Sequence, residues 1–193
     1  MKDKVTLFFD AAAKTWDEKG GPDPAILEKI ADIAGITENV TVLDAGCGTG
    51  VMFPVFLKRN AAAITGVDVS ENMLKAAAEK FSDERITLVC RDIAELSAGH
   101  GFDCVLTHNA FPHFLRQKEA LEKLKDLTLP GGTLTVAHSI SRQAVLDCHK
   151  NVPEISAELP EADALAAMFG DGFERFTVIS DEKCFIVSAV KKK

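Results

Sequence analysis

The feature that most constrains the fold is a regular alternation of short apolar runs with longer amphipathic segments between residues 40 and 138. The apolar runs are rich in β-branched residues, which favour strands, and the segments between them have helical spacing. Such alternation is typical of βαβ units, in which helices cover both faces of a parallel sheet. We therefore expect a doubly wound α/β fold. The expected strands span residues 40–45, 63–68, 86–90, 102–107 and 132–138, and the expected helices span about 50–60, 70–82, 93–97 and 117–127.

The C-terminal quarter departs from this alternation. Two strand-like runs follow one another there and are separated only by Asp181 and Glu182. A gap of this length predicts a hairpin, so this edge of the sheet should be antiparallel. The two runs span residues 173–180 and 183–190, and they follow helical segments at 141–150 and 161–169.

Two amphipathic helices are expected before the first strand, at residues 5–18 and 24–35. Pro22 and Pro24 precede or open the second of them, and proline is tolerated in the first turn of a helix. The chain shows no internal repeat and no second apolar core. We therefore expect residues 1–193 to form one domain.

Charge and composition narrow the classes of partner. The formal net charge of the 193 residues is −7, and the only basic run is at Lys191–Lys193. A protein that grips long nucleic acid usually carries a basic face, so nucleic acid is not an expected partner. No uncharged apolar stretch is long enough to span a membrane, and the N-terminus does not have the pattern of a signal peptide. The five cysteines show no paired spacing, which fits reduced thiols and a cytoplasmic protein.

A glycine-rich loop follows the first expected strand, in the sequence VLDAGCGTG at residues 42–50. Glycines allow a ligand to approach the backbone closely, and the N–H groups at the following helix start favour an acceptor-rich ligand. The dinucleotide-binding fingerprint needs its third glycine one place further on, where this chain has Val51. A carboxylate at Asp44 compensates a cationic ligand but offers nothing to a diphosphate. This loop therefore favours a sulfonium cofactor, S-adenosylmethionine, over a nicotinamide dinucleotide.

Acidic residues also end the next two expected strands. Asp68 ends the second strand, and its carboxylate can accept hydrogen bonds from both hydroxyls of a ribose. Asp92 ends the third strand, where it can accept from an adenine amino group while Ile93 packs on the ring. The alternative role for either acid is a helix N-cap, although Ser70 already fills that role after the second strand. Polar residues at three successive strand ends are expected where ligands bind to open α/β sheets.

The chain resembles class I S-adenosylmethionine-dependent methyltransferases of the small-molecule, type 11/25-like branch. The resemblance rests on five segments, in the order VLDAGCGTG, GVDVSENML, CRDIAEL, FDCVLTHNAFPHF and LPGGTLTVAHS. The resemblance covers roughly residues 38–140. It implies a Rossmann-like sheet of seven strands in the order 3-2-1-4-5-7-6, with the seventh antiparallel. It also implies that N-terminal helices at about 5–35, with Phe9, Trp16 and Asp17, form a lid over the cofactor.

The resemblance carries cofactor-binding roles over to residues of this chain. The loop from Asp44 to Gly50 would line the methionine moiety, Asp68 and Val69 the ribose, and Met73 with Asp92 and Ile93 the adenine. The fourth-strand motif lacks the Asn-Pro-Pro-aromatic run of amide and adenine amino methylases, and it places Asn109 at the cofactor. The expected cofactor-binding residues are Asp44, Gly46, Cys47, Gly48, Thr49, Gly50, Asp68, Val69, Met73, Asp92, Ile93 and Asn109.

Four of the five histidines are expected near the acceptor. His108 and His113 fall at or just after the end of the fourth strand, and His138 ends the fifth. His149 lies on the following helix, with Arg142 on the same face as a candidate anion anchor. Histidine is the usual general base near neutral pH and a frequent metal ligand. We expect His113, His138 and His149 to be the catalytic group; whether they act as bases or hold a metal is left open, and no metal site is assigned.

The expected function is in-line transfer of the sulfonium methyl group to a small-molecule acceptor, with a histidine removing the acceptor proton. Positioning supplies much of the rate, since the leaving group is already activated. Two alternative functions fit the sequence: a nicotinamide-dependent oxidoreductase, and a catalytically silent cofactor-binding subunit of a partner enzyme.

Overall fold

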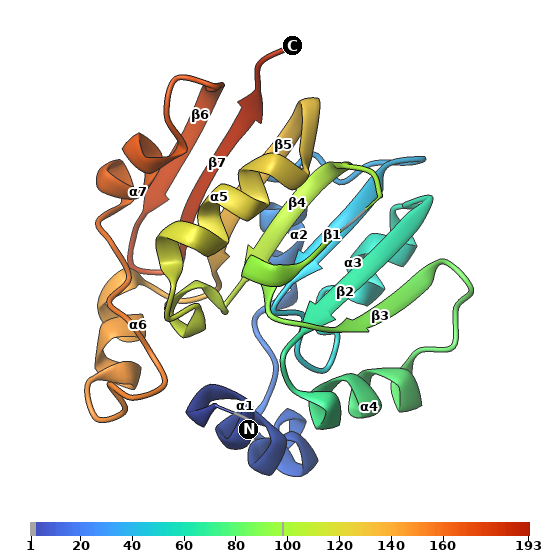
Figure 1. Ribbon diagram of the computed structural model, residues 1–193, viewed down its shortest axis with the longest axis vertical. Coiled ribbons are helices and arrows are strands. Elements are labelled where there is room, and N and C mark those ends of the chain that lie inside the picture. The colour runs from blue at the N-terminus through green and yellow to red at the C-terminus, as the bar shows by residue number, and fades with distance from the viewer. Residues whose placement is uncertain (1–2, 98) are drawn as a thin grey trace.

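The computed structural model describes residues 3–97 and 99–193, and a seven-stranded sheet forms its centre (Figure 1). The strands lie in the order β3-β2-β1-β4-β5-β7-β6, and all neighbours are parallel except that β7 runs antiparallel to β5 and β6. The expected strand order and the antiparallel hairpin are therefore confirmed. The strands are β1 (Thr41–Ala45), β2 (Ala63–Asp68), β3 (Ile86–Cys90), β4 (Phe102–His108), β5 (Thr128–His138), β6 (Phe173–Ser180) and β7 (Phe185–Lys191).

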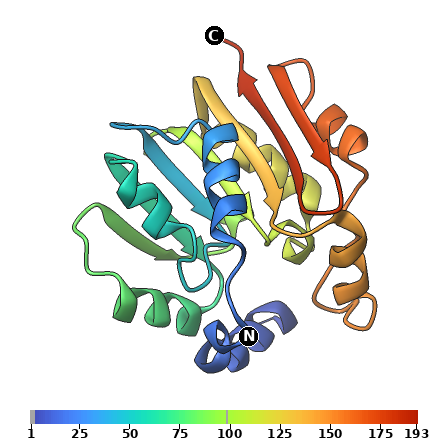
Figure 2. The ribbon, with the colours of Figure 1, turned by 180° about the vertical axis from the view of Figure 1, so that it is seen from behind.

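Helices cover both faces of this sheet (Figures 1 and 2). One apolar core packs α2, α3 and α4 against one face, and a second core packs α5, α6 and α7 against the other. The α-helices are α1 (Lys4–Ala12), α2 (Pro24–Ile33), α3 (Phe53–Lys58), α4 (Glu71–Lys80), α5 (Gln117–Leu127), α6 (Arg142–His149) and α7 (Ala162–Phe169). Short 3₁₀ turns are η1 (Ala13–Thr15), η2 (Asp17–Lys19), η3 (Ile93–Glu95) and η4 (Phe111–His113).

Most helix starts follow the capping signals in the sequence. The Ser70 hydroxyl accepts a hydrogen bond from the Met73 N–H at the start of α4, and Ser141 caps α6 in the same way. Asp23 caps α2, and Pro24 is its first residue. Because these caps satisfy backbone N–H groups that have no partner within the helix, they fix where each helix leaves the sheet.

The structure shortens three of the expected helices. The N-terminal helix ends at Ala12 and continues as η1 and η2 instead of reaching residue 18. The segment at 93–97 is only the 3₁₀ turn η3, and α3 begins at Phe53 because the glycine loop extends further than expected. The short turn η3 and the late start of α3 both lengthen the loops at the carboxyl edge of the sheet. The N-terminal helix α1 and its turns also lie at this edge (Figure 1).

Within the described residues, no helix combines the length and the apolar character needed to cross a bilayer.

Candidate cofactor and acceptor site

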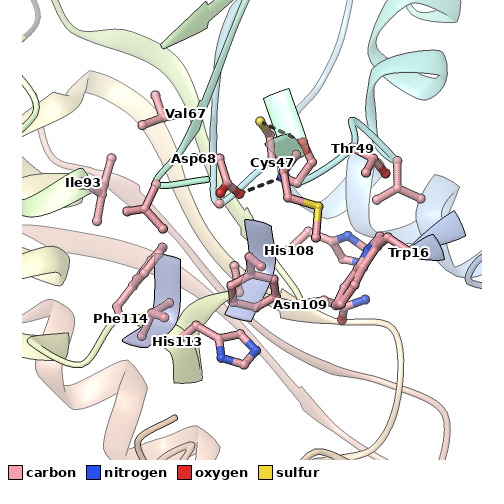
Figure 3. Close-up of a pocket in the computed structure, with 18 of the residues that line it drawn as sticks. Trp16, Cys47, Thr49, Val67, Asp68, Ile93, His108, Asn109, His113 and Phe114 are labelled. Atoms are coloured by element: carbon pink, nitrogen blue, oxygen red, sulfur yellow. Dashed lines mark hydrogen bonds between the residues drawn. The ribbon is translucent and has the colours of Figure 1, made fainter. Parts of the chain in front are cut away.

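A pocket of about 810 Å³ opens at the carboxyl ends of the parallel strands, beneath the N-terminal segment (Figure 3). Ligand sites in open α/β sheets are expected at this edge. Its walls combine the glycine loop, the ends of β2 and β4, and residues of α1 and its following turns. The expected site residues that line it are Gly46, Cys47, Gly48, Thr49, Asp68, Val69, Met73, Asp92, Ile93, Asn109 and His113.

The backbone of the glycine loop is tied to β2. The N–H groups of Gly46 and Cys47 both donate to the carbonyl oxygen of Val67, at 2.7 and 3.1 Å. Gly46 has φ +76°, and a Cβ atom there would overlap the methyl group of Ala110. Only glycine therefore fits at this position, and the loop passes close to the end of β4.

Asp68 joins the glycine loop to the start of α4. One carboxylate oxygen accepts from the Gly48 N–H at 2.9 Å, and the other accepts from the Ser70 N–H at 2.8 Å. Burial raises the pKa of this carboxyl, and these backbone hydrogen bonds lower it in part. Each carboxylate oxygen can accept a further hydrogen bond, so Asp68 can both shape the loop and accept from ribose hydroxyls.

The Asp92 end of the pocket is polar on its rim and apolar inside. Asp92 caps η3 by accepting from the Ala94 N–H at 2.9 Å, and its other oxygen accepts from Arg116 at 2.7 Å. The expected capping role is therefore present, but Asp92 and the buried Ile93 also line the pocket. Met73 lines the same pocket from α4.

Two expected cofactor residues are not part of the pocket wall. Asp44 and Gly50 belong to the loop, but the lining residues of the pocket do not include them. Asp44 is 2% exposed, and one of its carboxylate oxygens has no hydrogen-bond partner. Burial, followed by the charge of Asp68, raises the pKa of Asp44 to about 7. Asp44 thus lies buried behind the glycine loop, next to the charge of Asp68.

Side-chain hydrogen bonds hold the N-terminal segment over the pocket. The Thr49 hydroxyl and the Lys80 ammonium both donate to the Asp17 carboxylate, each at 2.7 Å. The Ser70 hydroxyl donates to Asp10 at 2.7 Å. Phe9, Trp16 and Asp17 line the pocket, as a lid would.

Asn109 locks the ends of β4 and β5 together. It adopts φ +54°, its amide donates to the Ser139 hydroxyl at 2.8 Å, and its side-chain oxygen accepts from the Ser139 N–H at 2.9 Å. This two-way contact holds the segment after β4 rigidly against the pocket.

The four histidines at this edge lie near one another but differ in whether they line the pocket. His113 lines the pocket, but its Nδ1–H donates to the Ile155 carbonyl at 2.9 Å and its Nε2 lies 3.3 Å from His149 Nε2. His138 is 2% exposed beside the Phe185 ring, and neither His138 nor His149 lines the pocket. The joint catalytic role of His113, His138 and His149 stays a prediction. Of these three expected catalytic histidines, His113 thus lines the pocket, whereas His138 and His149 lie behind its wall.

The reason is the alternation of side chains along a strand. Ala137 pairs with His108 across β5 and β4, so these two residues share one face of the sheet. His138 follows Ala137 and points to the opposite face, where it is buried beside the Phe185 ring and lies near His113 and His149. Burial lowers the pKa of His138 to about 3.

Arg142 does not act as an open anion anchor. Its guanidinium donates to the carbonyls of Leu159 and Pro160 and pairs with Glu158 and Glu161. Across residues 3–97 and 99–193, no group of three or more His, Cys, Asp or Glu side chains has the arrangement of a metal site.

His108 was not among the expected catalytic histidines, but it belongs to the pocket wall. It lines the pocket, is 5% exposed, and has no hydrogen-bond partner at either ring nitrogen. Burial lowers the pKa of its imidazole to about 4, so it is neutral at pH 7. The period-2 pattern of β4 could have identified it, because His108 follows Cys104 and Leu106 on one face.

Comparison with known proteins agrees with the sequence resemblance. A protein-family profile described as "Methyltransferase domain" matches residues 42–132. The malonyl-[acyl-carrier protein] O-methyltransferase of Priestia megaterium is 29% identical over 130 residues, which cover 65% of this chain and 47% of that protein. The ubiquinone biosynthesis O-methyltransferase of Coxiella burnetii is 27% identical over 141 residues, covering 69% and 60% of the two chains. The chain thus spans about half the length of the first of these relatives.

Solved structures share the whole fold. The N-methyltransferase NodS of Bradyrhizobium japonicum, solved with S-adenosyl-L-homocysteine, superposes with a TM-score of 0.73 at 14% identity, covering 99% of this chain and 100% of that chain. At this identity the likeness shows the fold.

Proposed function

Because the chain belongs to the class I S-adenosylmethionine-dependent methyltransferase family, we propose that it binds S-adenosylmethionine in the pocket and methylates a small-molecule acceptor. The observation that carries this proposal is the joint position of Asp68 and the glycine loop. A carboxylate suited to ribose hydroxyls is hydrogen-bonded to the N–H of Gly48, so the ribose and methionine subsites are built as one unit.

The residues present fit this cofactor. Gly46 lets the loop pass close to Ala110, and Gly46, Cys47, Gly48 and Thr49 form the wall on which the methionine moiety would lie. Val69 adjoins Asp68 at the ribose, and Met73, Asp92 and Ile93 enclose the adenine end. A volume of about 810 Å³ is within the range of about 300–1,000 Å³ typical of small-molecule sites.

Charge favours this cofactor over a nicotinamide dinucleotide. Asp44 and Asp68 place two acidic groups at the glycine loop, which suits the ammonium and sulfonium groups and opposes a diphosphate. When bound, S-adenosylmethionine supplies a methyl group on a positively charged sulfur that leaves as a neutral thioether.

The chain's own residues would hold and shield the reactants. The Asp17 latch to Thr49 and Lys80 would keep the N-terminal segment closed as a lid, excluding water from the pocket. The Asn109–Ser139 contact would hold the acceptor side rigid, because positioning supplies much of the rate in such transfers. The two curated relatives are named as O-methyltransferases, which favours an oxygen nucleophile among possible acceptors. Labelled methyl transfer from S-adenosylmethionine to a panel of small hydroxy and amino compounds tests this activity.

We expect Asp68→Ala to weaken S-adenosylhomocysteine binding by about 10- to 150-fold, or about 1.5–3 kcal/mol, the worth of hydrogen bonds to a charged group. The variant loses the ribose partner and also the anchor of Gly48. Titration calorimetry measures the dissociation constant, with the exposed Asp126→Ala as the matched control. If a folded Asp68→Ala protein binds S-adenosylhomocysteine like the wild type, Asp68 only shapes the loop and does not bind the ribose.

A further inference from the structure

His108 is a buried polar side chain whose hydrogen-bonding capacity is unused by the protein. Both of its ring nitrogens lack a partner, although the side chain lies on the pocket wall. A buried polar group without a partner is costly, so such groups in native proteins usually meet a ligand or water. His108, Asn109 and Trp16 lie together on the side of the pocket opposite Ile93 (Figure 3). His108 therefore belongs to the acceptor end and not to the adenine end.

The other histidine of the pocket cannot take this role as readily. Both nitrogens of His113 are engaged, one with the Ile155 carbonyl and the other with His149. Among the described residues of the wall, His108 is thus the buried imidazole that has no hydrogen-bond partner at either nitrogen.

The charges of the wall exclude a negatively charged acceptor group near His108. Within the described chain, the pocket is lined by two cationic side chains, Arg91 and Arg116. Arg116 is paired with Asp92 and also contacts Glu95 and Glu119, and Arg91 directly precedes Asp92 in the chain. Both arginines therefore belong to the adenine end, and a carboxylate or phosphate at His108 would meet no positive charge.

Aromatic rings border the same end of the pocket. Phe9 packs edge-on against Trp16 and against His113, with ring centroids 5.5 and 4.8 Å apart. Phe114 also lines the pocket, but on the side of Ile93 (Figure 3). Flat apolar walls of this kind bind planar ligands through edge and stacking contacts.

We propose that His108 binds the acceptor directly, and that the acceptor is a planar molecule presenting an uncharged hydroxyl or amino group. This inference rests on the proposed methyltransferase function and specifies its substrate class. The acceptor O–H or N–H donates to the unprotonated nitrogen of His108, which aims the nucleophile. As the oxygen or nitrogen bonds to the methyl carbon, the sulfur–carbon bond breaks with its electron pair left on sulfur, and the released proton passes to the imidazole and then to water.

Matched probes of different charge test this inference. The full chain, labelled with ¹³C and ¹⁵N in its histidines and saturated with S-adenosylhomocysteine, is titrated with phenol, aniline and benzoate at equal concentrations. We expect phenol or aniline to shift the imidazole signals of His108 in a saturable manner, and benzoate to bind at least about tenfold more weakly. In His108→Phe, phenol binding should fall about threefold to tenfold, the worth of one hydrogen bond, while S-adenosylhomocysteine binding stays within about twofold. His100→Phe, on an exposed loop, is the control.

The possible results distinguish a failure of the inference about His108 from a failure of the proposed methyltransferase function. Failure to bind S-adenosylhomocysteine contradicts the proposed function. Normal binding of S-adenosylhomocysteine overturns the inference about His108 if benzoate binds as well as phenol, if neither neutral probe moves the His108 signals, or if His108→Phe binds phenol like the wild type. The comparison of probes in the wild-type protein holds even if the variant does not fold.

Discussion

Gly46→Ala should destabilise the protein by about 2–5 kcal/mol and abolish measurable S-adenosylhomocysteine binding. The left-handed backbone at φ +76° costs a residue with a Cβ atom about 1–2 kcal/mol. The overlap of that atom with the methyl group of Ala110 adds about 1–3 kcal/mol of overpacking. Because the loop must move to relieve the overlap, we expect the proposed subsite for the methionine moiety to be lost. Urea unfolding and calorimetric titration measure the two effects.

Gly48→Ala is the matched control for this substitution. Gly48 also has a positive φ, +53°, but a Cβ atom there would have no heavy atom within 4 Å. We therefore expect only the backbone cost of about 1–2 kcal/mol. Equal losses of stability in Gly46→Ala and Gly48→Ala would show that the close approach of the loop to Ala110 does not matter.

Asp44→Asn should stabilise the protein without ligand at pH 8, by on the order of 2–4 kcal/mol. Asp44 is buried and its pKa is raised to about 7 from 3.8, first by burial and then by Asp68. A charged carboxylate at this site is therefore unfavourable in the folded state. Asparagine keeps the shape of the side chain and removes that charge.

The effect has a defined pH dependence. Below pH 3.8 the Asp44 carboxyl is protonated in both the folded and unfolded states. Between pH 3.8 and about 7 the folded protein keeps a proton that the unfolded chain has lost, so stability falls by about 1.4 kcal/mol per pH unit. The wild type and Asp44→Asn should thus be equally stable near pH 4 and should diverge as the pH rises toward 8.

The same charge should favour the cationic cofactor. S-adenosylmethionine affinity should rise between pH 6 and 8 in the wild type, as Asp44 ionises, and should change little in Asp44→Asn. Urea unfolding from pH 4 to 8, with the exposed Asp126→Asn as control, measures the stability. A difference between wild type and Asp44→Asn that does not vary with pH contradicts the raised pKa.

The sheet could be predicted from the sequence because each of its strands is a separate apolar run. All seven runs became strands close to the expected bounds, and the short gap at Asp181 and Glu182 correctly indicated an antiparallel hairpin. The strand order came from the family resemblance. The early end of α1 could not be read from helical spacing, since the turns that follow it are fixed by the contact of Asp17 with Thr49 and Lys80.

The glycine loop and Asp68 could be placed because the carboxyl ends of parallel strands meet at one edge of a sheet. The histidines were harder to place, since closeness to a strand end does not define which face a side chain takes. His138 is one residue beyond Ala137, the partner of His108, so it takes the opposite face of the sheet from His108 and does not line the pocket. The use of both His113 nitrogens depends on Ile155 and His149, which are distant in sequence, so it could not be inferred beforehand.

Calorimetric titration of the wild-type protein with S-adenosylhomocysteine and, separately, with NADH tests the central claim most directly. The structure places the carboxylates of Asp44 and Asp68 at the glycine loop, so we expect saturable binding of S-adenosylhomocysteine with one site per chain and no binding of NADH. Tight binding of NADH together with no heat from S-adenosylhomocysteine would contradict the account.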